Sequence, residues 1–263
     1  MASAIPSVLP TLPREFIWTD QPWGAVLQCV PLAAVAVHGW TTRQLAITGG
    51  PGSCDAQWQQ LAQAGAVTRA GIVAVHQVHG TEVVNAREVG QMVSRQADGL
   101  VSSDPSLMLT VRVADCVPLL ICDRRLGVVA AVHAGWRGSA AGIAGAAVSG
   151  LQDQYGSRAG DLVAALGPSI GPCCYSVGEE LVDAFKKNGH RASRVDRWFL
   201  RGRGLRLDLW RANREQLETA GIPASAVLVS GLCTACHPEW FYSYRREGSA
   251  AGRLVGFIRA VNR

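Results

Sequence analysis

The sequence lacks several features that would place it in a large class of proteins. It has no stretch of about 18 apolar residues without charge, so it predicts no membrane-spanning helix. The opening residues, MASAIPSVLPTLPREF, have no basic segment followed by an apolar one, so they do not resemble a secretory signal. No repeat with a period of about 20–50 residues occurs. We therefore expect a cytoplasmic protein with no membrane partner.

The composition is that of a compact α/β protein. Apolar residues make up 48% of the 263 residues and charged residues 17%, which excludes a disordered chain. Short apolar runs alternate with helical patterns along the whole length, and no low-complexity linker interrupts them. We expect one domain over residues 1–263, in which the first 20 or so residues form an extension.

Hydrophobic periodicity predicts the individual elements. Strands are predicted at 34–38, 71–78, 107–113, 117–122, 128–133, 162–166, 227–229 and 254–261. The runs at 117–122 and 128–133 are apolar throughout, which is typical of strands buried on both faces. After a turn at 134–138, Ser139 is predicted to cap a helix at 140–154. Further helices are predicted at 178–187 and 209–220.

Three segments concentrate residues that bind metals, namely HQVHG (76–80), ADCVP (114–118) and HAGWRG (133–138). Each lies at or near a predicted strand end beside Gly, Pro or Asp. His79, Cys116 and His133 would make an open three-ligand zinc site, although buried core histidines and an apolar thiol explain the same residues. His76 competes with His79, and residues three apart on a strand face opposite sides. The position of His79 before Gly80 favours His79.

Four more cysteines have no assigned function from sequence. The pattern Cys233-x-x-Cys236-His237 resembles a haem attachment site, but that chemistry requires export. Half of a zinc site is another interpretation of this pair, but Cys173 and Cys174 are adjacent and supply no matching C-x-x-C. Local packing, with Cys233 near the mouth of the site, is the interpretation that the sequence favours.

Charged residues in turns indicate where a substrate would bind. Arg43, Asp98, Asp115, Arg137 and Arg245 all follow or precede apolar strands. An arginine in such a turn usually forms a surface ion pair, but Arg137 precedes the predicted helix start, where free N–H groups suit an anion such as phosphate.

A basic segment runs from residue 186 to residue 206, with Asp196 as its one acidic residue. We interpret this segment as a solvated surface. The alternative interpretation is a basic wall that attracts an anionic substrate. No nucleic-acid-binding motif accompanies it.

Six segments together resemble the YfiH family, also called laccase-domain or polyphenol oxidase-like proteins. They are QVHGTEV (77–83), ADGLVSSDP (97–105), ADCVPLLICD (114–123), VAAVHAGWRGSAAGI (129–143), GPSIGPCCYSVGEE (167–180) and YSYRREG…GR (242–253). The resemblance implies a layered α/β/β/α fold with mixed sheets, similar to the cytotoxic necrotizing factor toxins. It also implies a purine nucleoside phosphorylase that cleaves adenosine, inosine and methylthioadenosine with phosphate, with adenosine deamination as a further activity. The implied metal, Zn²⁺ or Cu²⁺, is bound by His79, Cys116 and His133.

The residues narrow the chemistry that the family labels suggest. A multicopper laccase needs many histidines in His-x-His pairs, whereas this chain has six histidines and no such pair. For phosphorolysis, Arg43, Arg137 and the N–H groups after Gly138 are assigned to phosphate, and Asp98 or Asp115 to ribose or purine. For deamination, Asp115 is the catalytic proton carrier. Ser139, Tyr175 and Arg245 complete the predicted substrate site.

Two other function classes use the same residues. In a cysteine hydrolase acting on a cell-wall precursor, Cys116 is the nucleophile and His133 its base, which fits the name peptidoglycan editing factor given to bacterial members. A non-catalytic purine-binding module is the third class. The expected partners are a purine nucleoside and phosphate, and the chain is expected to be a monomer or a weak homo-oligomer.

Overall fold

Two six-stranded sheets form the centre of the protein, which we describe from a computed structural model over residues 8–47, 56–89 and 95–262. The first sheet has the order β1 (Phe16–Gln21), β2 (Gly24–Cys29), β3 (Ala36–Thr41), β14 (Leu254–Ala260), β7 (Met108–Val113) and β4 (Ile72–Val73). The second has the order β13 (Val227–Val229), β10 (Leu162–Leu166), β8 (Val117–Asp123), β9 (Val129–Ala134), β6 (Gly99–Ser102) and β5 (Val83–Asn85). Both sheets mix parallel and antiparallel pairs.

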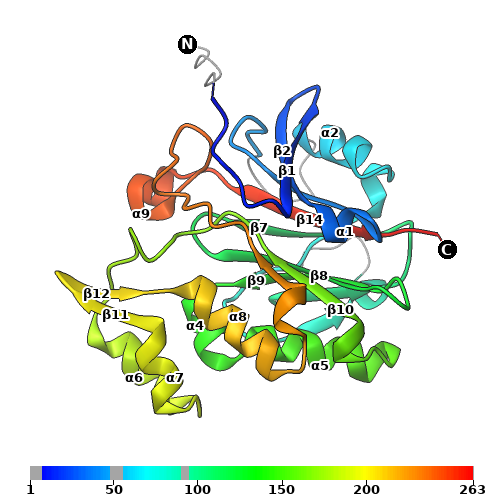
Figure 1. The fold of residues 1–263 in the computed structure, drawn as a ribbon. Helices are drawn as coiled ribbons and strands as arrows, with labels where there is room; N and C mark the ends of the chain where they lie inside the picture. The colour runs from blue at the N-terminus through cyan, green and yellow to red at the C-terminus, as the bar shows by residue number, and fades with distance from the viewer. Residues whose placement is uncertain (1–7, 48–55, 90–94, 263) are drawn as a thin grey trace.

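The sheets pack face to face, and helices cover their outer faces (Figure 1). Strands β7 and β14 of the first sheet contact β8 and β9 of the second, so β8 and β9 are buried along their whole length. This burial explains their continuous apolar sequence. Helix α2 (Ala56–Ala64) covers the first sheet, while α4 (Trp136–Ala141), α5 (Ile143–Tyr155) and α8 (Leu209–Thr219) cover the second. The predicted α/β/β/α layering is confirmed.

The remaining elements lie at the edges of these layers. The helices are α1 (Val30–Ala33), α3 (Ala86–Val89), α6 (Glu179–Lys187), α7 (Ala192–Trp198) and α9 (Tyr244–Glu247). A separate hairpin consists of β11 (Phe199–Gly202) and β12 (Gly204–Leu207). Short 3₁₀ turns occupy Arg69–Gly71, Ala159–Asp161, Ala224–Ala226 and Gly248–Ala250. No helix in the described part of the chain is long and apolar enough to cross a membrane.

Two predicted elements are wrong in ways that matter for the site. The strand predicted at 71–78 ends after Val73, because the chain then leaves the sheet and pairs locally at His76 with Gln96. The helix predicted to begin at Ala140 begins four residues earlier, at Trp136, with extended Gly135 as its N-cap. It breaks at Gly142, whose φ of 91° lies in the left-handed region. Ser139 is therefore inside α4 and caps nothing.

Part of the predicted N-terminal extension contributes to the first sheet. Residues 16–21, which the sequence placed in an N-terminal extension, form β1 and pair with β2 through the register Phe16↔Cys29 to Gln21↔Gly24. Cys54 lies outside the described residues.

Candidate metal centre and cavity

His79, Cys116 and His133 meet where the chain passes between the two sheets. Cys116 follows β7 of the first sheet and directly precedes β8 of the second, while His133 lies in β9. Antiparallel pairing of β8 with β9 sets Pro118 opposite His133, which brings the thiol and that imidazole together. His79 comes from the loop before β5. One possible ligand atom from each residue lies within 4.8 Å of the others, and the two imidazole centroids are 4.7 Å apart.

Asp98 holds both histidines of this centre in place through hydrogen bonds. Its buried carboxylate accepts a hydrogen bond of 2.7 Å from Nδ1 of His133. It also accepts hydrogen bonds from the backbone N–H groups of residues 78, 79 and 80, with N···O distances of 3.2, 2.9 and 2.6 Å. These bonds hold His79 at a φ of 62°, a conformation that non-glycine residues rarely adopt. One carboxylate thus orients both histidines.

The thiol and the imidazole of this centre stabilise each other's charged forms. Burial alone would raise the pKa of Cys116, but the neighbouring His133 and His79 outweigh it and lower that pKa to about 6. Burial alone would lower the pKa of His133, but the Cys116 thiolate and the Asp98 carboxylate raise it to about 9. The metal-free pair is therefore a thiolate and an imidazolium at neutral pH.

The donor set fits a thiophilic or borderline metal. Two imidazoles and a thiolate are ligands that Zn²⁺ and Cu²⁺ both accept. The Nδ1 atom of His133 is occupied by Asp98, which leaves Nε2 for a metal, as in the carboxylate–histidine–metal arrangement of many zinc proteins. Three protein ligands leave a coordination position open for another group.

A cavity of about 680 Å³ opens beside the centre and carries mostly positive charge. Cys116, His79 and His133 form part of its wall. Four arginines also line it, namely Arg112, Arg137, Arg245 and Arg253. Asp115 is the one acidic residue among the described lining residues. Such a lining raises the local concentration of anions.

Asp115, Tyr175 and Arg245 form one connected wall of the cavity. The Asp115 carboxylate accepts the Thr234 hydroxyl and the backbone N–H of Arg245, each at 2.6 Å. The Arg245 guanidinium lies 4.9 Å from the centroid of the Tyr175 ring. Burial, followed by the negative charge of Cys116, raises the pKa of Tyr175 to about 12, so its hydroxyl keeps its proton at neutral pH.

Three residues predicted to bind substrate do not line this cavity. Arg43 pairs with Glu247 at 3.3 Å and stacks 4.6 Å from the Tyr242 ring centroid. Ser139 is buried and accepts a hydrogen bond of 2.9 Å from the Asn213 amide. Asp98 lies behind His133.

The backbone N–H predicted to hold phosphate after Gly138 is also engaged. The N–H of Ser139 donates to the carbonyl of Gly135 within α4, because the helix starts earlier than the sequence predicted.

The basic segment at 186–206 lies away from the cavity. Arg197 pairs with Glu215 at 2.8 Å, and Arg201 pairs with Glu179. None of the described residues of this segment lines the cavity, so the solvated-surface interpretation fits the structure.

Sequence reasoning missed several lining residues. Gln77, Trp136 and Tyr244 reach the cavity, as do Arg112 and Arg253. Arg112 had a detectable signal, since it interrupts the otherwise uncharged strand β7. His76 lines the cavity although it lies outside the group of three metal-binding residues, which includes His79 as the sequence favoured.

Comparison with known protein families places this fold and its centre in one class of proteins. The family model described as "Multi-copper polyphenol oxidoreductase laccase" matches residues 47–261. The chain therefore belongs to this laccase-domain family, the YfiH family.

Solved structures of two relatives share the whole architecture. The crystal structure of the Bacillus licheniformis hypothetical protein YfiH superposes with a TM-score of 0.84 at 29% identity, over 95% of this chain and 100% of that one. The structure of YlmD from Geobacillus stearothermophilus gives a TM-score of 0.81 at 32% identity, over 94% and 100%.

Curated relatives carry names of purine enzymes. "Purine nucleoside phosphorylase YlmD" of G. stearothermophilus is 36% identical over 71% of both chains. "Purine nucleoside phosphorylase" of Bacteroides thetaiotaomicron is 38% identical over 61% of this chain, and the match spans 60% of that relative's length. "Adenosine deaminase RL5" of an unknown prokaryotic organism is 40% identical over 62% of both.

Few histidines are available to bind the copper cluster that the family description suggests. Of the six histidines, His38 accepts the N–H of Cys29 and His190 bonds to the Ala140 carbonyl. Within the described residues, the only group of possible metal ligands that contains histidine is the centre with Cys116. That set supports one mononuclear site.

Proposed function

We propose that this protein is a purine nucleoside phosphorylase acting on adenosine, inosine and methylthioadenosine in the cavity beside Cys116. The observation that carries the proposal is the meeting of a cationic wall and a three-ligand metal centre in one cavity. The names of the relatives support the same reaction.

Phosphate is assigned to the arginines of the wall. A guanidinium binds phosphate oxygens in a bidentate manner. Arg137 is held with its guanidinium 4.4 Å from the Trp136 ring centroid, and Arg245 is held on Tyr175, so both are pre-oriented at the cavity. We assign these two arginines to phosphate, while Arg112 and Arg253 add positive potential.

The rest of the cavity suits a nucleoside. Its volume of about 680 Å³ lies in the ordinary range for small-molecule sites. Trp136, Tyr175 and Tyr244 offer aromatic surface for a purine. The protonated Tyr175 hydroxyl is a hydrogen-bond donor, and the Asp115 carboxylate is an acceptor for ribose hydroxyls or the purine.

The reaction balances within this set of groups. A phosphate oxygen forms a bond to C1′ of the ribose as the C1′–N9 bond breaks, and the purine leaves with the bonding electron pair. The purine takes up the proton that hydrogen phosphate loses on forming ribose 1-phosphate, and we assign Asp115 as the relay whose carboxylate accepts this proton and passes it to the purine. The products are the free base and ribose 1-phosphate. The same carrier would serve adenosine deamination.

His79, Cys116 and His133 are the residues that would hold Zn²⁺, or Cu²⁺ as the alternative. When bound, the metal would supply Lewis-acid polarisation of a substrate oxygen or nitrogen. Asp98 serves the centre by fixing the tautomer of His133 and the turn that carries His79.

The test is phosphate-dependent release of hypoxanthine from inosine, with ribose 1-phosphate measured as the second product. We expect activity that is lost with a chelator, restored by Zn²⁺ and absent in Cys116→Ala. Arg203→Ala, an exposed change in the basic segment, is the matched control and should retain activity. A protein that binds Zn²⁺ yet leaves inosine intact at saturating phosphate would overturn the proposal.

A cysteine hydrolase is the second candidate, because Asp98, His133 and Cys116 also form a charge-paired catalytic triad. The Cys116 thiolate would attack an amide carbonyl of a cell-wall precursor, and His133 would protonate the departing amine. Water would then hydrolyse the thioester. This reaction predicts full activity in metal-free protein and irreversible loss on alkylation of Cys116. Inosine cleavage that requires Zn²⁺ would exclude it as the activity measured in that assay.

A further inference from the structure

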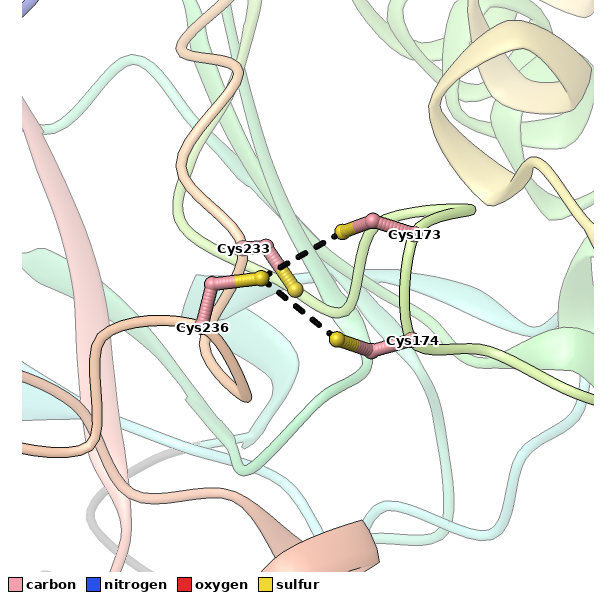
Figure 2. Close-up of side chains that lie close together, drawn as sticks. All are labelled: Cys173, Cys174, Cys233 and Cys236. Carbon is pink, nitrogen blue, oxygen red and sulfur yellow. Dashed lines mark hydrogen bonds between the residues drawn. The ribbon is translucent and has the colours of Figure 1, made fainter.

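Four cysteines outside the centre gather between two loops, as Figure 2 shows. Cys173 and Cys174 lie in the turn after β10, and Cys233 and Cys236 lie in the turn after β13. Their four sulfur atoms all lie within 4.8 Å of one another. We call this group the four-cysteine cluster. The sequence favoured local packing because no second C-x-x-C was present, but the structure brings the adjacent pair to the C-x-x-C pair.

The sheet brings these loops together. Strands β10 and β13 are parallel neighbours, so their carboxyl ends emerge at the same edge. Beyond the strands, the backbone pairing continues at Ser169, which donates its N–H to Leu232 and accepts that of Thr234, each at 3.1 Å. The cluster is therefore built on ordered backbone that the core already fixes.

The sulfur separations suit a shared metal ion better than a disulfide. The Cys236 sulfur lies 3.5 Å from that of Cys173 and 3.4 Å from that of Cys174. A disulfide bond is about 2.05 Å long. Four sulfurs around tetrahedral Zn²⁺ at about 2.3 Å are about 3.8 Å apart, so only small side-chain shifts are needed.

The surroundings of Cys233 suit a thiolate. The backbone N–H of Gly171 donates to the Cys233 sulfur at 3.2 Å, and such N–H groups orient thiolate ligands in metal sites. Cys233 is buried, whereas Cys173 and Cys236 are exposed, so an ion has a path from solvent. Four cysteine ligands are typical of closed structural zinc sites.

We propose that the four-cysteine cluster binds one Zn²⁺ through four thiolates, at a structural site separate from the centre at Cys116. Each thiol releases its proton to solvent as its sulfur–zinc bond forms, so binding involves no oxidant or reductant.

The proposed site would brace one wall of the cavity. Cys174 directly precedes Tyr175, and Thr234, between the other two cysteines, donates its hydroxyl to Asp115 at 2.6 Å. Zinc would tie these two loops together at the place where both reach the cavity. Its effect on activity rests on the proposed function, but its binding does not.

The experiment is zinc analysis of reduced, purified protein by mass spectrometry. We expect about two equivalents in wild type and one in Cys116→Ala, which destroys the centre but leaves the cluster. Cys236→Ser should hold one equivalent and the double variant none. Cys29→Ala, a buried thiol outside both groups, is the control and should retain two.

The ligand set is then read from Co²⁺. Loaded into Cys116→Ala, Co²⁺ should give the intense sulfur-to-metal charge-transfer bands and tetrahedral d–d bands of four thiolates. This measurement leaves the cluster intact, so it holds even where Cys236→Ser fails to fold. Cys173→Ser should weaken the bands.

Two results would overturn the proposal. One is folded Cys116→Ala that binds neither Zn²⁺ nor Co²⁺. The other is an intact mass lower by two hydrogens and restored by reductant, which would identify a disulfide in the cluster. Because neither result depends on inosine cleavage, failure of this proposal is distinguishable from failure of the phosphorylase.

Discussion

Gly135 offers the most direct perturbation of the centre, because its missing side chain leaves room for two of the ligands. A Cβ atom placed there would lie 2.9 Å from the Cys116 sulfur and 2.9 Å from Cδ2 of His79. Ordinary contacts begin at about 3.4 Å, so both side chains would have to move by about 0.5 Å. The backbone does not resist the change, since Gly135 has a φ of −76° and a ψ of 172°, which alanine adopts readily.

The size of the effect follows from this displacement. Functional groups must be held within about 0.5 Å of their working geometry, and a shift of about 1 Å costs up to about 100-fold in rate. We expect Gly135→Ala to lower kcat/KM for phosphate-dependent inosine cleavage about 10- to 100-fold, or about 1.4–2.7 kcal/mol in transition-state stabilisation. Zinc affinity should fall as well. Overpacking should cost about 1–3 kcal/mol of stability.

The assay compares initial rates, zinc affinity and thermal unfolding. The matched control is Gly145→Ala in α5, where the added methyl group meets no atom within 4 Å. This control should keep wild-type activity and gain about 0.5–1 kcal/mol of stability, because alanine favours a helix more than glycine does. The reasoning is refuted if Gly135→Ala folds, binds zinc as tightly as wild type and keeps its activity within twofold.

Three other changes test the electrostatics of the site. Asp98→Asn removes the charge that orients His133, so zinc affinity should fall about 10- to 100-fold in a competition with a chromogenic chelator. In metal-free protein, alkylation of Cys116 by iodoacetamide should have its midpoint near pH 6, against the ordinary thiol value of 9.0. Arg137→Ala should raise KM for phosphate about 10- to 100-fold in initial-rate kinetics, since hydrogen bonds to charged groups contribute about 1.5–3 kcal/mol.

Each of these three predictions has an outcome that would contradict it. Unchanged zinc binding in Asp98→Asn would show that the carboxylate does not position His133. An alkylation midpoint near pH 9 would mean that His133 does not stabilise the thiolate. If Arg203→Ala raised KM for phosphate as much as Arg137→Ala, the anion site would not lie in the cavity.

The pH dependence of stability gives a further check on the thiolate–imidazolium pair. The Cys116 contribution is present above its unfolded pKa and is lost as pH falls through about 6. The His133 contribution is present below 6.5 and is lost as pH rises through about 9. Between pH 6.5 and 9 the two slopes are opposite and cancel. Metal-free wild type should therefore differ from the Cys116→Ala/His133→Ala double variant by a nearly constant free energy across this range, measured by urea unfolding.

The sequence alone determined the buried strands and pointed to the three residues of the centre, while the family resemblance implied the layers and the ligand set. The apolar runs of β8 and β9 predict strands buried on both faces, and burial between a second sheet and the helices requires that composition. His79, Cys116 and His133 were found because each stands at or near a predicted strand end within a distinctive segment. Local pattern was sufficient wherever burial and periodicity agreed.

The tertiary structure decided what no local pattern encodes. Asp98 looked like a substrate ligand until its hydrogen bonds placed it behind His133. Ser139 looked like a helix cap until the extended Gly135 moved the helix start. Cys173 and Cys236 are more than 60 positions apart, and parallel pairing of β10 with β13 brings them together. The spacing of residues along the chain does not predict such contacts, because hydrogen bonds between strands that are distant in sequence bring these residues together.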